Sequence, residues 1–85
     1  MSALEARIDA DVRAGRHGEV IAELDALTVE HPFREHLRAM HMLALYRSGR
    51  QAEALRAFGR TRATLVEDLG IDPSPELREL ERRIL

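Results

Sequence analysis

The feature that most constrains the fold is a repeat with a period of 34 residues. Gly15 and Gly49 lie 34 positions apart, each follows an apolar segment, and each is followed by an arginine. At the same offset, Leu24 matches Phe58. A chain with this regularity is expected to fold as repeated units, each of which buries an apolar face against the next.

The apolar residues recur at the spacing of α-helices along the whole chain. A glycine just beyond a helix suits the left-handed cap, and Ser74 followed by Pro75 is typical of a helix start. We therefore predict an all-α fold of antiparallel hairpins, the first over about residues 3–31 and the second over about 33–69, with a C-terminal helix over about 75–85. The predicted apolar stripes are Leu4, Ile8 and Val12; Val20, Ile21, Leu24 and Leu27; Phe33, Leu37, Met40, Ala44 and Leu45; Ala54, Leu55, Phe58, Leu65 and Leu69; and Leu77, Leu80, Ile84 and Leu85.

The second helix of the second hairpin contains an Ala-x3-Phe spacing, Ala54 and Phe58. Pro32 lies eight residues after Leu24, in the matching part of the first unit, whereas Val66 stands at that offset in the second. A period of 34 with a small residue, an aromatic residue and a terminal proline is the signature of tetratricopeptide repeats. The small residue lets two helices approach, and the large one fills the gap beside it. The sequence thus predicts a tetratricopeptide-like array.

Charge is distributed unevenly along the chain. The net charge is −2, but residues 36–66 contain six arginines and a single acid, while the segments on both sides are acidic. Either these charges pair across packed helices, or the middle segment forms a basic patch that docks an acidic partner. The candidates for such a patch are Arg56, Arg60 and Arg62. Direct nucleic-acid binding through residues 36–66 is a further alternative, which the net charge does not favour.

The sequence shows no pattern of a catalytic or metal site. There is no cysteine, no phosphate-binding glycine loop, no Gly-x-Ser-x-Gly and no His-Glu-x-x-His motif. We expect no enzymatic activity, no cofactor and no metal. No apolar run approaches the roughly 18 residues of a membrane span, and no signal-peptide pattern is present, so a cytoplasmic protein is expected.

In helical repeat arrays, the first helix of each hairpin lines the surface used for binding. Tyr46 and Arg47 are the main candidates, because Tyr and Arg often contribute most of an interface's binding energy. The helical stripe Leu4, Ile8 and Val12 is expected to be partly uncovered and to support self-association. Helical spacing places the following residues on the predicted binding face: Glu5, Asp9, Val12 and Arg13 from the first hairpin, and His36, Ala39, Leu43, Tyr46 and Arg47 from the second.

Three segments resemble a known family: AGRHGEVIAEL, EHPFREHLRAMHMLALYRSGRQAEALRAF and LVEDLGIDPSPELRELERRIL. They are similar to the bacterial transcriptional activator domain of the SARP/AfsR-like regulators of actinomycetes. The resemblance covers nearly the whole chain and is most specific over residues 68–77. It implies a tetratricopeptide-like domain, normally placed after a winged-helix DNA-binding domain. It also implies a role in transcription regulation.

The sequence contains no winged helix, so the resemblance assigns DNA binding to none of its residues. We expect a fragment of a longer regulator that binds protein partners, by docking on a helix face or groove. The partner would be another copy, other domains of the parent regulator, or the transcription machinery. A general tetratricopeptide adaptor unrelated to transcription is the alternative.

Overall fold

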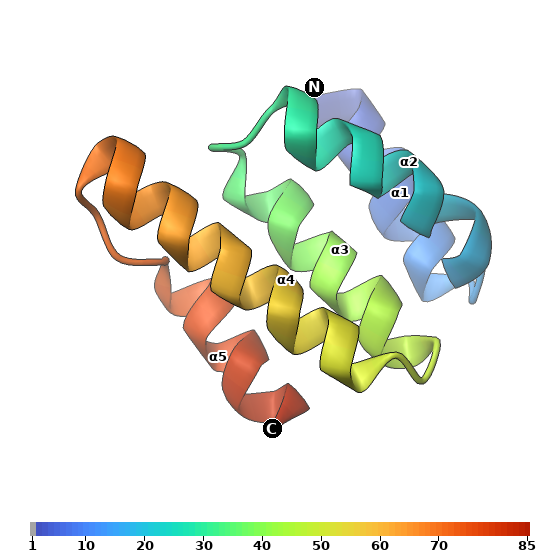
Figure 1. Ribbon diagram of the computed structural model, residues 1–85. Coiled ribbons are helices and arrows are strands. Elements are labelled where there is room, and N and C mark those ends of the chain that lie inside the picture. Colours follow the sequence, from blue (N-terminus) through green and yellow to red (C-terminus); the bar gives the residue numbers. More distant parts are fainter. Residues whose placement is uncertain (1) are drawn as a thin grey trace.

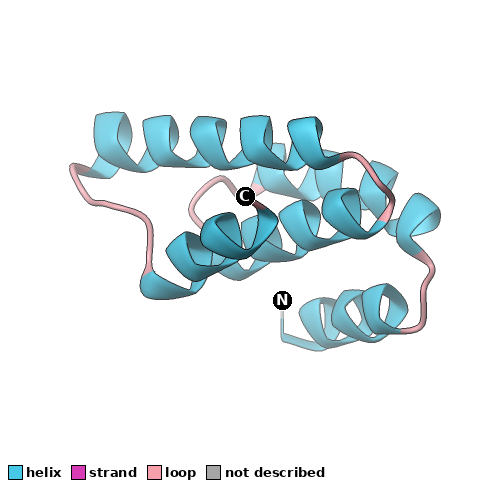
Figure 2. Ribbon diagram, turned by 90° about the horizontal axis from the view of Figure 1, so that it is seen from below, coloured by secondary structure: helices cyan, strands magenta, loops and turns pink. Residues whose placement is uncertain are grey.

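Helices account for most of residues 2–85, the part of the chain that the computed structural model describes (Figures 1 and 2). No strand occurs within these residues. The all-α, tetratricopeptide-like prediction is therefore confirmed. The elements are α1 (Ser2–Arg13), α2 (His17–Glu30), α3 (Glu35–Arg47), α4 (Gln51–Thr64), the π-helical turn η1 (Leu65–Leu69) and α5 (Pro75–Ile84).

The 34-residue repeat is visible in the helix boundaries. Helices α2 and α4 both contain 14 residues, and each end of α4 lies 34 positions after the matching end of α2. The first helices of the two hairpins, α1 and α3, end at Arg13 and Arg47, which are separated by the same offset. The sequence thus repeats because the helix-turn-helix unit repeats.

The turns inside the two hairpins also match. Gly15 and Gly49 have φ values of 85° and 78°, in the left-handed region that side chains disfavour. Two hydrogen bonds of the Schellman type close the helices at these glycines. They run from Arg16 N–H to the Asp11 carbonyl and from Arg50 N–H to the Leu45 carbonyl, both at 2.9 Å.

Helix α3 is the centre of the fold. It packs against α1, α2, α4 and α5, and Figure 1 shows it in the middle of the molecule. Because neighbours surround it, side chains on several of its faces are buried, including Leu37, Met42 and the polar His41. The repeat positions Leu24 and Phe58 are buried in the same core.

The segment after α4 departs from the repeat. The π-helical turn η1 ends at Gly70, which has a φ of 67°. Ser74 then caps α5 by accepting a hydrogen bond from Leu77 N–H at 3.4 Å, and its own N–H donates to Glu35 Oε1 at 2.8 Å. The start of α5 is thereby attached to the start of α3. None of the helices in residues 2–85 has the length and apolar character needed to cross a membrane.

Candidate functional site

A groove of about 210 Å³ runs over the first helices of both hairpins and the C-terminal helix. We call it the α1–α3–α5 groove. It brings together several residues that the sequence placed on the predicted binding face, and it adds side chains from α5. Its lining consists of Asp9 and Arg13 of α1; His36, Ala39, Met40 and Leu43 of α3; and Glu76 and Leu80 of α5.

The floor of this groove is apolar. Ala39 and Met40 are buried, and Leu43 and Leu80 are half-buried. Half-buried leucines can still lose apolar surface to water when a partner covers them, which favours binding. The floor therefore offers contact area to an apolar side chain of a partner.

The rim of the groove is charged, and its charges are paired. Arg13 lies 3.1 Å from Asp9 Oδ2 on α1. Across the groove, His36 Nδ1 of α3 lies 3.3 Å from Glu76 Oε1 of α5. An apolar floor inside a polar rim is the usual anatomy of a protein-binding patch.

Tyr46 and Arg47 lie one turn beyond Leu43, at the end of α3, and do not line the groove. Tyr46 is 42% exposed, and Arg47 is exposed. Two other residues of the predicted face are engaged elsewhere. Val12 is fully buried, and Glu5 pairs with Arg34.

The prediction that the stripe on α1 is partly uncovered is wrong for Ile8 and Val12. Ile8 and Val12 are 0% exposed, and Leu4 is partly buried against the same core. The physical reason is that α1 packs on both α2 and α3, which together cover its apolar face. Ile8 and Val12 hold the fold together and present no surface for a second copy.

The predicted basic patch is divided between two sites. Arg56 and Arg60, one turn apart on α4, line hollows between α2, α3 and α4. Arg62 lies elsewhere, in a cleft of about 310 Å³ between α4 and α5. The prediction that all three arginines form one patch is therefore wrong, because two positions on a helix correspond to about 200° of rotation.

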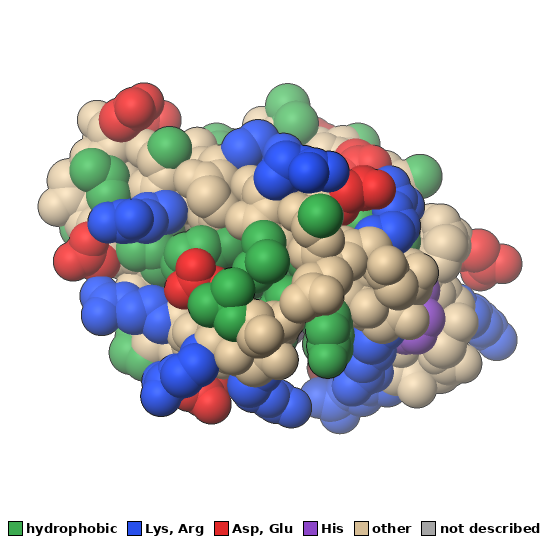
Figure 3. All heavy atoms as spheres, turned by 60° about the horizontal axis from the view of Figure 1, so that its bottom comes forward, with side chains coloured by type: hydrophobic (Ala, Val, Ile, Leu, Met, Phe, Trp, Pro, Cys, Tyr) green, Lys and Arg blue, Asp and Glu red, His purple; other side chains and the backbone are tan. Residues whose placement is uncertain are grey.

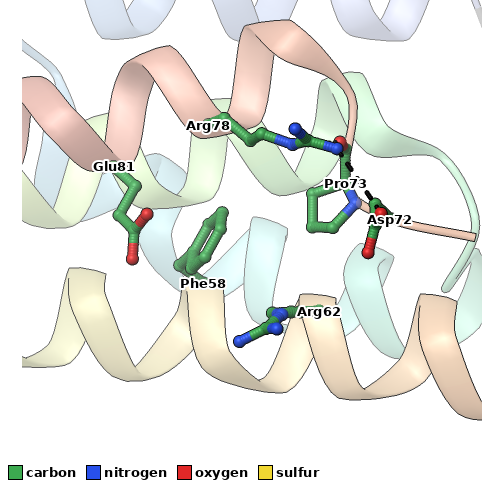
Figure 4. Close-up of a pocket in the computed structure, with 6 residues that line it drawn as sticks. All are labelled: Phe58, Arg62, Asp72, Pro73, Arg78 and Glu81. Atoms are coloured by element: carbon green, nitrogen blue, oxygen red, sulfur yellow. Dashed lines mark hydrogen bonds and ion pairs between the residues drawn. The ribbon is translucent and has the colours of Figure 1, made fainter.

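Figure 4 shows this α4–α5 cleft, with Phe58 and Arg62 on α4 and Arg78 and Glu81 on α5. Arg78 Nε donates a hydrogen bond to the Pro73 carbonyl at 3.0 Å, which ties the preceding loop to α5. Phe58 is 7% exposed and packs in the core. The hydrogen bond of Arg78 and the packing of Phe58 thus hold α5 in place.

The face that carries α4 and α5 gathers apolar side chains at its centre, with arginines around the edge (Figure 3). Near the end of α4, the exposed apolar residues are Val66, Leu69 and Ile71. Leu69 was expected in a helical stripe, and no exposed surface was predicted from the sequence at this place. Within residues 2–85, no three His, Asp or Glu side chains gather so as to hold a metal ion.

The model of the family described as "Bacterial transcriptional activator domain" matches residues 1–85. The chain belongs to this family. It is 58% identical over 81 residues to the regulatory protein AfsR of Streptomyces griseus, covering 95% of this chain and 8% of AfsR. It is 49% identical over 85 residues to the regulatory protein DnrI of Streptomyces peucetius, covering 100% of this chain and 31% of DnrI.

A solved structure shows the same helical fold. It is that of Mycobacterium tuberculosis EmbR in complex with a low-affinity phosphopeptide, with a TM-score of 0.95 and 51% identity over 96% of this chain and 22% of that one. The chain thus spans less than a third of each of these relatives. The transcription-regulator assignment made from the sequence is confirmed at the level of the family.

Proposed function

We propose that this chain is the protein-interaction part of a bacterial transcriptional regulator and that a helix of a protein partner docks in the α1–α3–α5 groove. The observation that carries this proposal is the convergence of Asp9, Arg13, His36 and Leu43, from two helices of the repeat, around one apolar floor. In repeat arrays this is the surface used for binding.

The size of the groove favours a protein partner over a small ligand. At about 210 Å³ it is smaller than the roughly 300–1,000 Å³ of small-molecule sites. It suits one or two apolar anchors of an amphipathic helix, whose polar flanks would meet the charged rim. Tyr46 and Arg47 would extend the contact beyond the end of the groove.

Family membership favours a regulator over a general adaptor. The relatives AfsR and DnrI are regulatory proteins, and EmbR is a transcriptional regulatory protein that binds a phosphopeptide. We therefore propose that the partner is the transcription machinery or a domain of the same regulator, and that binding takes place in the cytoplasm. Self-association through the α1–α3–α5 groove would be a variant of this docking, with a second copy of the chain as the partner.

The test uses purified Streptomyces RNA polymerase holoenzyme as the probe. Its affinity for the immobilised chain is measured for the wild type, for Leu43→Gln combined with Tyr46→Ala, and for Leu55→Gln. Leu55 is a half-buried leucine of α4 outside the groove, so it controls for the loss of apolar packing. Light scattering over a concentration series measures binding to a second copy in the same three proteins.

We expect the groove variant to bind at least about tenfold more weakly, which corresponds to about 1.4 kcal/mol, and the control to bind like the wild type. Circular dichroism verifies that both variants are folded. Equal binding by all three proteins would contradict the proposal, and the absence of binding to both the polymerase and a second copy would leave a domain of the same regulator as the partner.

A further inference from the structure

The opposite side of α3 carries a second hollow surface. Two adjoining hollows of about 150 and 380 Å³ lie between α2, α3 and α4 and share Asp25, His41 and Arg60. Arg56 lines one of them and Arg38 the other. We call the two hollows together, which Glu53 also lines, the arginine groove.

The arginines of this groove lack counter-ions. Within residues 2–85, no carboxylate lies at ion-pair distance from Arg38, Arg56 or Arg60. Arg38 donates a hydrogen bond through Nε to the Pro32 carbonyl at 3.2 Å, and this contact neutralises no charge. Most other arginines of the chain do have a carboxylate partner, so the concentration of unpaired ones here is distinctive.

The acids that line the groove are already engaged. Glu53 accepts two hydrogen bonds from Arg50, at 3.0 and 2.6 Å. Asp25 Oδ1 lies 2.6 Å from Nε2 of His41, a side chain only 7% exposed, although the two are not aligned for a hydrogen bond. Three arginines without an ion-pair partner thus face two carboxylates, one of which, Glu53, is already paired with Arg50.

The arginines also act on each other and on the histidine. Burial lowers the pKa of Arg38, and the positive charge of Arg60 lowers it further. Burial lowers the pKa of His41, and the charges of Arg60 and Arg38 reinforce that shift against the opposing effect of Asp25. The charge of Arg60 thus acts on both groups, while burial is the larger cause of each pKa shift and Asp25 opposes it at His41.

We propose that the arginine groove binds the carboxylates of an acidic segment of a protein partner. The planar guanidinium group matches a carboxylate with two parallel hydrogen bonds, and Arg38 and Arg60 present such groups from neighbouring helices. Arg56, one turn before Arg60, provides a place for a second carboxylate. An acidic stretch with carboxylates about one turn apart would satisfy both.

A protein segment fits this groove better than a nucleic acid. Nucleic-acid affinity comes mainly from many phosphate contacts over a broad basic face. Here the carboxylates of Asp25 and Glu53 line the same surface, where they would repel phosphates, and the chain as a whole carries a charge of −2. The site also lies on the side of α3 away from the α1–α3–α5 groove, so it does not depend on the function proposed above.

The experiment titrates a synthetic hepta-glutamate peptide into the whole 85-residue chain and follows the amide and arginine side-chain signals by NMR. The test variant is Arg56→Gln/Arg60→Gln. The matched control is Arg82→Gln/Arg83→Gln on α5, which removes the same charge from an exposed surface outside the groove. A short DNA duplex is titrated in parallel.

We expect the NMR signals that move during the titration to be concentrated around His41 and Arg38. The affinity for the peptide should be at least tenfold weaker in Arg56→Gln/Arg60→Gln, and it should change by less than twofold in the control. All four arginines are exposed, and the only ion pair among them is the surface pair of Arg82 with Glu79, so both variants should fold. An equal loss of peptide affinity in both variants would show that the attraction is unspecific, and it would overturn the proposal. It would also be overturned if the DNA duplex bound more tightly than the peptide with the same dependence on Arg56 and Arg60.

Discussion

A single chemical change, glycine to alanine, is expected to have opposite effects at two positions of the second hairpin. Gly49 has a φ of 78° and Gly59 lies inside helix α4. A Cβ added at either position meets no heavy atom within 4 Å. Steric clash with neighbours is therefore absent from both, and only the local backbone conformation distinguishes them.

The expected magnitudes follow from that difference. At Gly49, the left-handed conformation costs an alanine about 1–2 kcal/mol. Reduced freedom of the unfolded chain returns about 0.4–1 kcal/mol, so a net loss of about 1 kcal/mol is expected. At Gly59, alanine should stabilise the exposed helix position by about 0.8–1 kcal/mol. For a domain of this size, each change corresponds to a Tm shift of about 4–8 °C, downward for Gly49→Ala and upward for Gly59→Ala.

The assay is urea unfolding followed by far-ultraviolet circular dichroism, with equal slopes required for a comparison of midpoints. Gly15→Ala repeats the test in the first hairpin, where the φ of 85° predicts the same loss as Gly49→Ala. A stabilising Gly49→Ala would refute the left-handed cap at Gly49, and a destabilising Gly59→Ala would refute the expected gain inside α4.

Three further outcomes are expected. Leu24→Ala, at a fully buried repeat position, should lower the free energy of unfolding by about 2–5 kcal/mol in urea titrations, and a loss below 1 kcal/mol would contradict the packing described. Ile8→Glu should unfold the chain, as seen by circular dichroism, whereas a folded variant would show that α1 is not part of the core. Burial lowers the pKa of His41 in the folded state, so this histidine is protonated at a higher pH in the unfolded chain than in the folded one. The wild type should therefore lose stability as pH falls below about 6.5, and His41→Gln should lose less; an unchanged pH slope would refute this.

The helices and their pairing could be predicted because the information is local. Apolar spacing defines each helix, Gly15 and Gly49 end the first helices, and Ser74 starts the last one. The convergence of His36 and Leu43 on one side of α3 could also be predicted, since it needs only the 3.6-residue turn of a helix.

Features that depend on how helices pack against each other could not be predicted in the same way. The burial of Ile8 results from α3 covering α1, and the contribution of Glu76 to the groove results from the docking of α5. The arginine groove needs three helices, because Asp25, Arg38 and Arg60 are far apart in sequence. Helical geometry alone, however, is enough to separate Arg62 from Arg60, because two positions on a helix differ by about 200° of rotation. Their predicted grouping rested only on their proximity along the chain.

The central position of α3 has a consequence for how the domain can be divided. In an ordinary repeat array each unit contacts only its neighbours, so units can be added, removed or melted one at a time. Here every other α-helix rests on α3, including α5, which lies outside the two repeats. Removing the first hairpin would uncover that shared helix, and removing the second would remove α3 itself. The chain should therefore unfold in one cooperative step and resist shortening by a repeat, so that it behaves as one indivisible unit despite its modular sequence.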